Sequence, residues 1–349
     1  MEITDIDYEP VNFELRKEFK FGDFCLSKLE YVLVRIETRD GLMGLGEAPA
    51  YWDPNGETQE SVIGALDLME DKIKGSKVSQ INKVNQKWDR SCREAYSARC
   101  AVDLALYDLL GKKLDVPAYK ILGGENGRVK MPETIPLNFS LEDAEKKVRE
   151  TDGNLFKMKA DSDIERLNKI ATCMTEAKKN PKIALDANQT WRNPVNAIRK
   201  ISGLNFEPEW IEQPIRSSDV KGLSKLDSVI MADESFYSVQ NFRRIKDSVD
   251  MFNIKLAKSG GLSKAAQLAR MIESENKRYI TGSMLESPIG SMAAYQFSKA
   301  FRPVWMEASG CSLIKGVNRK FDLQGENLTK NDKPGLGVSS EDLGRYYPF

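Results

Sequence analysis

The chain has 349 residues, in which 52 lysine and arginine residues balance 52 aspartate and glutamate residues. The length allows one very large domain or two ordinary ones, and the balanced charge favours neither nucleic acid nor an acidic membrane surface as a partner. No run of about eighteen apolar residues is present, so we expect no membrane span. The sequence contains no histidine, which excludes histidine metal ligands, histidine general bases and Ser-His-Asp or Cys-His nucleophile systems.

The first residues and the cysteines indicate the cellular compartment. Residues 1–5 lack the basic and apolar regions of a signal peptide. The five cysteines are widely spaced and form no CxxC pair. Such a pattern is typical of a reduced protein with mostly buried thiols, so we expect a cytoplasmic protein.

Residues 1 to about 50 are predicted to form a β-meander. Residues 31–38 have strand composition, 39–41 form a turn, and 42–48 form the returning strand. The loop at 19–24 is aromatic and contains glycine, so it is either a mobile lid or an ordinary hairpin tip. The loop at 51–56 is of the same kind, and its Trp52 either lines a substrate pocket or only packs two domains together.

Residues 58–124 are predicted to be helical, with apolar residues at helical spacing between 98 and 114. Gly123 and Gly124 end this segment, and we place a domain boundary just after them. The prediction is a first domain of residues 1–125, a second of residues 126–318, and a tail of residues 319–349. The tail is polar and rich in turns, so we expect it to pack back on the first domain.

From residue 129 onward the sequence repeats a short apolar strand, a polar tip and a segment with helical patterning. The candidate strands are 129–137, 156–159, 183–188, 210–214, 229–234, 251–255, 278–281 and 303–307. Ser140 and Asp163 stand where helices between the strands should begin. This rhythm is typical of a parallel β/α barrel, in which the active site lies at the carboxyl ends of the strands.

Three carboxylates end successive strands of this repeat, about one strand–helix unit apart: Asp186, Glu212 and Asp233. Carboxylates brought this close would repel one another and raise each other's pKa values unless a cation lay between them. Oxygen ligands without histidine or cysteine favour Mg²⁺, with Mn²⁺ as an alternative, over Zn²⁺. A single acid at a strand end can simply cap the next helix, but three at matched tips favour a metal site.

Lysines stand on both sides of these acids. Lys157 and Lys159 alternate along one strand and therefore share a face, and Lys255 ends a strand across the barrel mouth. A neighbouring lysine, a cation and a dry site each lower a lysine pKa, and a neutral lysine can act as a general base. Two opposed bases permit racemisation or epimerisation beside a carboxylate, whereas one base with a spectator lysine permits cycloisomerisation or β-elimination.

At these residues the sequence resembles the enolase superfamily, and specifically its muconate lactonizing enzyme subgroup. The matching barrel motifs are Lys157-Met158-Lys159, Asp186-Ala187-Asn188, Ile211-Glu212-Gln213-Pro214, Met231-Ala232-Asp233-Glu234-Ser235, Lys255-Leu256-Ala257-Lys258-Ser259-Gly260-Gly261 and Gly282-Ser283-Met284-Leu285-Glu286. Residues 44–48 and 334–337 resemble the capping domain of the family. The resemblance spans nearly the whole chain.

The resemblance implies an α/β fold in which a modified (β/α)7β TIM barrel carries an α+β capping domain built from both termini. It implies Mg²⁺ bound by Asp186, Glu212 and Asp233, with Lys159 and Lys255 as the acid–base pair and Lys258 as the rival for the second base. The absence of histidine excludes the mandelate racemase arrangement. Further substrate-binding or supporting residues would be Lys157, Asn188, Glu234, Lys258, Glu286, Glu307 and Trp52.

The motifs leave the small-molecule carboxylate substrate open. Dipeptide epimerases, N-acylamino acid racemases, o-succinylbenzoate synthases and muconate cycloisomerases all share these catalytic residues. The best-known dipeptide epimerases carry Asp-x-Asp after the eighth strand to hold the substrate's ammonium, but residues 305–309 leave only Glu307. Our first hypothesis is a Mg²⁺-dependent racemase or epimerase of an amino-acid derivative or dipeptide. The alternatives are a muconate cycloisomerase, an o-succinylbenzoate synthase-type lyase and a carboxylate-binding protein without activity; by family analogy, a homo-oligomer is open to this chain.

Overall fold

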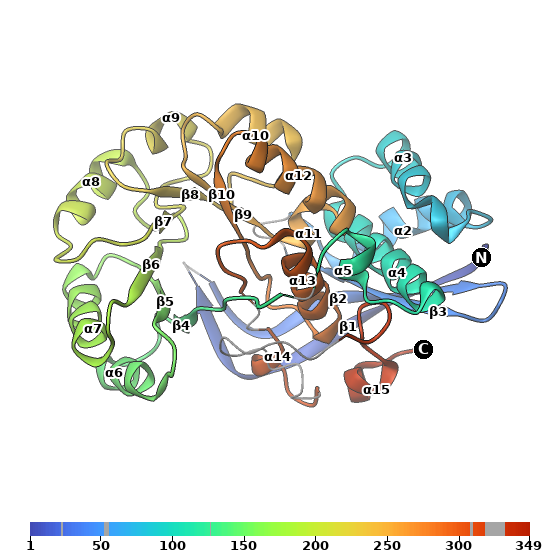
Figure 1. Ribbon diagram of the computed structural model, residues 1–349, viewed down its shortest axis with the longest axis horizontal. Coiled ribbons are helices and arrows are strands. Elements are labelled where there is room, and N and C mark those ends of the chain that lie inside the picture. Colours follow the sequence, from blue (N-terminus) through green and yellow to red (C-terminus); the bar gives the residue numbers. More distant parts are fainter. Residues whose placement is uncertain (22–23, 52–55, 126, 308–309, 318–331) are drawn as a thin grey trace.

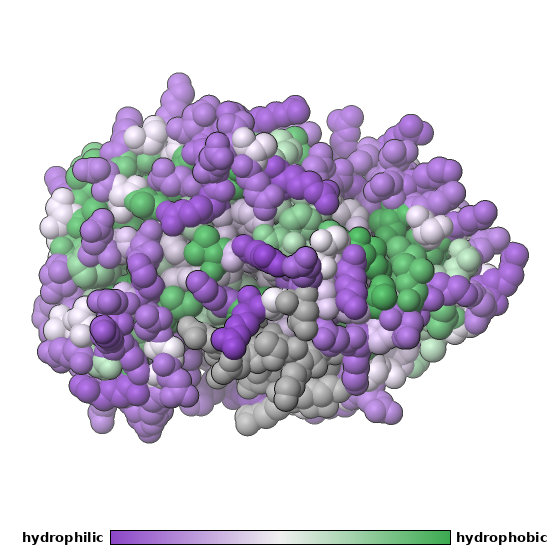
Figure 2. Space-filling model, viewed as in Figure 1, coloured by the Kyte–Doolittle hydropathy of each residue, from purple (hydrophilic) through white to green (hydrophobic). Residues whose placement is uncertain are grey.

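The computed structural model describes residues 1–21, 24–51, 56–125, 127–307, 310–317 and 332–349. Figure 1 shows a curved parallel sheet with helices on its outer side, next to a cap made of an antiparallel sheet and further helices. The predicted fold class, a modified barrel with an α+β cap, is therefore confirmed. In the described part of the chain no helix has both the length and the apolar character needed to cross a membrane, and hydrophilic side chains cover most of the face in Figure 2.

The sheet of the cap is antiparallel with the strand order β1-β2-β3. Its strands are β1 (Ile3–Phe21), β2 (Phe24–Thr38) and β3 (Met43–Pro49). The predicted meander is thus confirmed. The β1–β2 pairing continues to Phe21 opposite Phe24, so most of the loop predicted at 19–24 belongs to a long hairpin. Residues 22–23 at its tip, and Trp52 in the second predicted loop, lie outside the described residues.

Helices cover one face of this sheet. They are α2 (Gln59–Ile73), η1 (Val78–Gln80), α3 (Ile81–Ser91), α4 (Tyr96–Leu114) and α5 (Ala118–Ile121). The helix α4 is buried along most of its length because it packs between β3 and the barrel helix α11. This close packing needs glycine in β3: a Cβ on Gly46 would lie 1.8 Å from the carbonyl oxygen of Ala101, and one on Gly44 would lie 2.2 Å from that of Ala105.

The described end of the chain, residues 332–349, contacts the cap. Gly335 forms a parallel bridge with Pro117, and the amide of Leu336 donates a 2.9 Å hydrogen bond to the Asp108 carboxylate. The last elements are α15 (Ser340–Leu343) and η3 (Gly344–Tyr346). The domain boundaries at 125/126 and 318/319 stay predictions, since residues 126 and 318–331 are outside the described part.

Seven parallel strands follow one another in chain order around the barrel. They are β4 (Glu133–Ile135), β5 (Leu155–Lys159), β6 (Lys182–Asp186), β7 (Ile211–Glu212), β8 (Ile230–Ala232), β9 (Met251–Ile254) and β10 (Arg278–Thr281). The first strand is shorter than the predicted 129–137. The predicted eighth strand at 303–307 forms only an isolated bridge to β10. It still closes the barrel, since the amide of Met306 donates a 2.9 Å hydrogen bond to the carbonyl of Lys130.

Helices alternate with these strands on the outside of the sheet (Figure 1). The side chains of Ser140 and Asp163 cap α6 and α7 by accepting hydrogen bonds from the amides of Asp143 and Arg166, which confirms both predicted helix starts. The barrel helices are α6 (Leu141–Glu150), α7 (Ile164–Ala177), α8 (Pro194–Ser202), α9 (Val220–Leu223), α10 (Val239–Ile245), α11 (Leu256–Ser259), α12 (Leu262–Ser274), α13 (Pro288–Phe301) and α14 (Gly310–Leu313).

The barrel interior has an apolar plug under a polar layer. The plug consists of Leu155, Ala184, Trp210, Met231, Met251, Ile280 and Trp305. Two residues further along each segment lie Lys157, Asp186, Glu212, Asp233, Asn253, Gly282 and Glu307. Because side chains two positions apart in a strand point to the same face, this second set lies directly on the plug. The seven segments thus change from apolar to polar at one level, and that level forms the floor of the site.

Candidate active site

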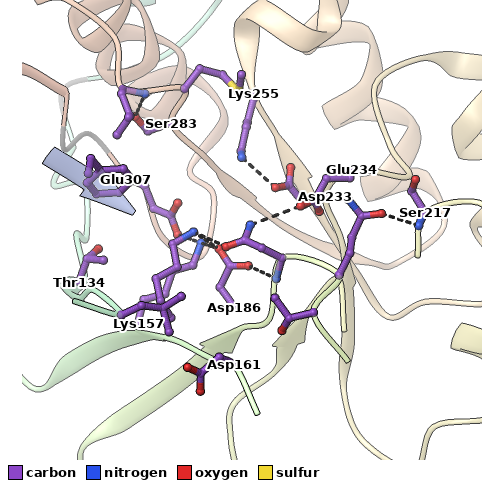
Figure 3. A pocket seen from close by; sticks show the side chains of 18 of the residues that line it. Thr134, Lys157, Asp161, Asp186, Ser217, Asp233, Glu234, Lys255, Ser283 and Glu307 are labelled. Atoms are coloured by element: carbon purple, nitrogen blue, oxygen red, sulfur yellow. Dashed lines mark hydrogen bonds and ion pairs between the residues drawn. The ribbon is translucent and has the colours of Figure 1, made fainter. Parts of the chain in front are cut away.

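A cavity of about 890 Å³ opens at the carboxyl ends of the barrel strands. Residues of the cap line one side of it. Residues of the polar layer, among them Lys157, Asp186, Asp233 and Glu307, line its floor (Figure 3). The following predicted site residues line it: Lys157, Lys159, Asp186, Asn188, Asp233, Glu234, Lys255 and Glu307. The barrel therefore brings together side chains from the ends of four strands, β5, β6, β8 and β9, and from the closing segment.

Three predicted residues lie behind the cavity wall. Glu212 is fully buried in the polar layer. Lys258 donates a 2.7 Å hydrogen bond to the main-chain oxygen of Asp233. Glu286 accepts hydrogen bonds from the hydroxyl of Ser283 and the amide of Met284, so its carboxylate holds the loop after β10. A role of Glu286 in substrate binding stays a prediction.

The ammonium group of Lys157 lies among three carboxylates. It is 3.0 Å from Oδ2 of Asp186, 2.6 Å from Oε2 of Glu212 and 2.7 Å from Oε1 of Glu307. Burial lowers the pKa of Lys157, but the three carboxylates outweigh it and leave that pKa well above the usual value. Lys157 is therefore a fixed positive charge at the floor of the cavity.

Lys159 contacts the acid at the end of β6. Its ammonium group lies 2.7 Å from Oδ2 of Asp186 and 2.8 Å from Oδ1 of Asn188. Burial raises the pKa of Asp186, but the ammonium groups of Lys157 and Lys159 outweigh it and lower that pKa to about 2. Asn188 in turn donates a 3.3 Å hydrogen bond to Glu234, so one polar network connects the ends of β5, β6 and β8.

Across the floor, two lysines contact Asp233. Lys255 lies 2.8 Å from Oδ2, and Lys258 contacts Oδ1. Burial lowers the pKa of Lys255, but Asp233 and Glu212 outweigh it, so that pKa is above its usual value. The prediction that the surroundings lower the lysine pKa is therefore wrong for Lys157 in this arrangement, because three carboxylates contact it. The pKa of Lys255 is raised for the same kind of reason. Only Lys255 of the two lysines on Asp233 lines the cavity.

The three acids predicted to bind a cation end the adjacent strands β6, β7 and β8. As placed, no trio of acidic or cysteine side chains in the described ranges surrounds one point closely enough to hold a metal. Lysine ammonium groups contact all three acids instead. Yet burial and repulsion from Asp186 raise the pKa of Glu212 to about 8. Its buried Oε2 forms an ion pair but no hydrogen bond. Asp186, Glu212 and Asp233 therefore offer only oxygen ligands, repel one another, and include an oxygen atom without a hydrogen bond. These properties fit a hard divalent cation.

Asn253 belongs to the polar layer and was missed by the sequence reasoning. Its side-chain amide donates a 2.7 Å hydrogen bond to Oε1 of Glu212. A Cβ on Gly282 would lie 2.1 Å from Oδ1 of Asn253, so glycine at that position gives the amide its space. The sequence did contain a signal for Asn253. It is the one polar residue within the apolar run 251–254, and it stands two positions after Met251 of the plug.

The outer wall of the cavity also contains residues that the sequence reasoning missed. Arg192 lies in the loop after β6, and Arg216 and Ser217 lie in the loop after β7. Apolar lining comes from Phe19, Leu26, Tyr51, Met284 and Leu285. The course of a loop decides whether its residues face the site, and strand periodicity does not predict that course.

The family follows from two matches. Residues 140–342 match the family described as "Enolase C-terminal domain-like", and residues 9–123 match "Mandelate racemase / muconate lactonizing enzyme, N-terminal domain". The chain belongs to the mandelate racemase/muconate lactonizing enzyme family. The predicted resemblance is thus confirmed, and the family places this enzyme in the enolase superfamily.

Three relatives with a named activity are racemases or epimerases. The chain is 30% identical to an N-succinyl-L-Arg/Lys racemase of Bacillus cereus, over 97% of this chain and 95% of that protein. It is 30% identical to a hydrophobic dipeptide epimerase of Enterococcus faecalis, over 97% and 100%, and to an L-Ala-D/L-Glu epimerase of Bacillus subtilis, over 97% of each. These matches confirm that the chain is an isomerase of this family.

Solved structures of the family superpose along the whole chain. The Bacillus cereus N-succinyl Arg/Lys racemase has a TM-score of 0.90 at 26% identity and covers 100% of this chain and 99% of its own. The Enterococcus faecalis dipeptide epimerase, complexed with Mg and the dipeptide L-Leu-L-Tyr, has a TM-score of 0.89 at 28% identity, over 97% and 100%. Magnesium is therefore found in a structure that shares this fold.

Proposed function

We propose that the chain is a Mg²⁺-dependent racemase or epimerase acting at the α-carbon of an amino-acid derivative, with Mn²⁺ as an alternative cation. One observation carries this proposal. Lys159 and Lys255 reach the same cavity from β5 and from the end of β9, with three strands between them in the sheet. Two lysines that face one substrate from different sides can remove and return a proton on opposite faces of a carbon.

Asp186, Glu212 and Asp233 would hold the cation, which supplies stabilisation for the negative charge that develops on the substrate carboxylate. Lys157 adds a fixed positive charge beside them, since three carboxylates keep it protonated. It can attract the substrate carboxylate to the floor of the cavity. The apolar wall from the cap, with Phe19 and Tyr51, covers the opposite side and limits access of water to the reacting carbon.

Lys159 and Lys255 would exchange roles with the configuration of the substrate. On one enantiomer, Lys159 Nζ takes the α-proton and Lys255 Nζ delivers a proton to the other face, and on the opposite enantiomer the roles reverse. A lysine that accepts a proton must begin neutral. The contact with Asp233 raises the pKa of Lys255, so loss of that contact would lower this pKa toward the range of a base.

The experiment is ¹H NMR of the purified protein with Mg²⁺ in D₂O, against pooled L-dipeptides and N-acyl-L-amino acids. We expect one α-proton signal to disappear while chiral analysis detects the opposite configuration. Chelation of the metal should stop both changes. Silence across the pool, together with turnover of muconate or of the o-succinylbenzoate precursor, would contradict the proposal and favour a cycloisomerase or lyase. Binding without any turnover would favour a carboxylate-binding protein.

A further inference from the structure

Two arginines on the outer wall of the cavity take no part in the chemistry proposed above. Arg192 and Arg216 both line the cavity and both have exposed side chains. Among the described residues neither guanidinium group makes an ion pair or a hydrogen bond. Each lysine on the floor, in contrast, contacts at least one carboxylate. Among the described lysines and arginines that line the cavity, Arg192 and Arg216 are therefore the ones without an ion-pair partner.

The two loops that carry these arginines are fixed to each other. The amide of Ser217 donates a 2.8 Å hydrogen bond to the side-chain oxygen of Gln189 (Figure 3). The amide of Trp191 donates a 3.1 Å hydrogen bond to the carbonyl of Pro214, and the indole of Trp191 is fully buried. The side chains of Arg192 and Arg216 thus project from a paired support next to the catalytic floor.

Backbone strain supports a functional role for this support. Asn188, Gln189, Arg192 and Gln213 all have positive φ values, of 40°, 65°, 67° and 34°. Residues other than glycine adopt this region at a cost, and such strain is concentrated at binding and catalytic sites. Two of the four are joined directly across the loops, since the amide of Gln189 donates a 2.8 Å hydrogen bond to the carbonyl of Gln213.

The acids that line the cavity already have contacts of different kinds. Glu307 forms an ion pair with Lys157 at 2.7 Å. Within the described part of the chain Asp161 and Glu234 form no ion pair, but each carboxylate accepts a hydrogen bond, Asp161 from the amide of Asp163 at 2.8 Å and Glu234 from the side chain of Asn188 at 3.3 Å. An anion at the outer wall would meet two guanidinium groups without ion-pair partners among the described residues. Guanidinium groups match carboxylates in both charge and planar geometry.

We propose that Arg192 and Arg216 form a subsite for a second carboxylate, so that the substrate carries one carboxylate at the reacting carbon and another at its distal end. This inference rests on the proposed function, because that function places the reacting carboxylate at the floor beside Lys157. The second carboxylate belongs to an N-acyl group, such as succinyl, or to the side chain of the amino acid. The intervening part of the substrate packs on the apolar wall of Phe19, Leu26 and Leu285.

Binding to the Lys159→Ala variant tests the subsite without turnover. Calorimetry with Mg²⁺ compares N-succinyl-L-leucine with its distal amide, N-succinamoyl-L-leucine, and N-acetyl-L-glutamate with N-acetyl-L-glutamine. We expect the acid of one pair to bind about tenfold or more tightly than its amide, since charge-assisted hydrogen bonds exceed neutral ones. The pair that shows the preference identifies the source of the second carboxylate.

Substitutions assign the preference to the two arginines. In the same background, Arg192→Gln and Arg216→Gln should each weaken binding of the preferred acid about tenfold and leave the amide unchanged. The control is Arg199→Gln, since Arg199 is exposed on α8 and does not line the cavity. In the active enzyme, either substitution should raise KM for the acid with little change in kcat.

Three outcomes would overturn the subsite. The acid and the amide could bind equally in both pairs, or neither acid could bind at all. The preference for the acid could also survive in both Arg192→Gln and Arg216→Gln. The proposed function is tested separately by α-hydrogen exchange with wild-type enzyme in D₂O. Exchange of acid and amide forms at equal rates would leave the racemase proposal intact and remove the subsite. An arginine-dependent binding preference without any exchange would retain the subsite and remove the racemase proposal.

Discussion

The side-chain amide of Asn253 donates a 2.7 Å hydrogen bond to Oε1 of Glu212, and both side chains are fully buried. The two residues lie on β9 and β7, so the bond spans the strand between them. It leaves Oε2 of Glu212 directed at the ammonium of Lys157. Asn253 therefore fixes which oxygen of Glu212 remains available to a cation.

Replacing Asn253 with alanine should weaken divalent-cation binding by about 10- to 100-fold, because groups that orient a metal ligand contribute to affinity on this scale. Calorimetric titration with Mg²⁺ or Mn²⁺ measures the change, and turnover of the variant should recover at high metal concentration. Asn205→Ala serves as control, since Asn205 is exposed and remote from the cavity. Unchanged metal affinity in a folded Asn253→Ala protein would exclude this orienting role.

Alanine at Gly46 should destabilise the junction between β3 and α4. Its Cβ would lie 1.8 Å from the carbonyl oxygen of Ala101, so the helix or the strand must move. We expect a loss of about 1–3 kcal/mol in the free energy of unfolding, the usual cost of overpacking. Urea unfolding measures it. The matched control is Gly64→Ala in α2, where the Cβ meets open space and alanine should be neutral or stabilise by about 0.5–1 kcal/mol. An equal effect at both positions would contradict the packing argument.

Glu47 should make stability depend on pH. Burial raises its pKa from 4.5 to about 8, although Ser287 donates hydrogen bonds to it. Between these pH values the folded protein keeps a proton that the unfolded chain releases, so the free energy of unfolding falls as pH rises from about 4.5 to about 8. Glu47→Gln removes this term, and its stability relative to wild type should therefore increase with pH across that window.

Urea unfolding of both proteins at pH 5, 6, 7 and 8 measures the difference for Glu47→Gln. The exposed residue Glu142 provides the control substitution, Glu142→Gln, which should shift stability by a similar small amount at every pH. A constant difference between Glu47→Gln and wild type across the range would show that Glu47 does not titrate in this way.

Much of the barrel floor was predictable because strand periodicity is a local property. Asp186, Asp233 and Lys255 end short apolar runs, and parallel strands bring such ends to one edge, so their convergence on one cavity follows from spacing alone. The direction in which the lysine pKa values shift did not follow from the spacing. It depends on which carboxylate each ammonium contacts, and that contact arises only once the barrel has closed.

Other features lay beyond local patterns for physical reasons. The course of the loops after β6 and β7 is set by hydrogen bonds between them, so the position of Arg192 and Arg216 on the cavity wall required the structure. The segment 303–307 has strand composition, yet it forms one bridge because it joins β10 on one side and a short run at Lys130 on the other. Glu286 ends a strand-like motif but turns its carboxylate into its own loop.

The central claim is that Lys159 and Lys255 act on opposite faces of one carbon. The most direct test is α-hydrogen exchange in D₂O, followed by NMR, for each enantiomer of an accepted substrate with wild-type, Lys159→Ala and Lys255→Ala proteins. We predict that wild type exchanges both enantiomers, that each variant loses racemisation, and that each retains exchange of only one enantiomer, opposite for the two variants. Exchange of both enantiomers by either variant, or loss of the same enantiomer in both, would contradict the two-base account.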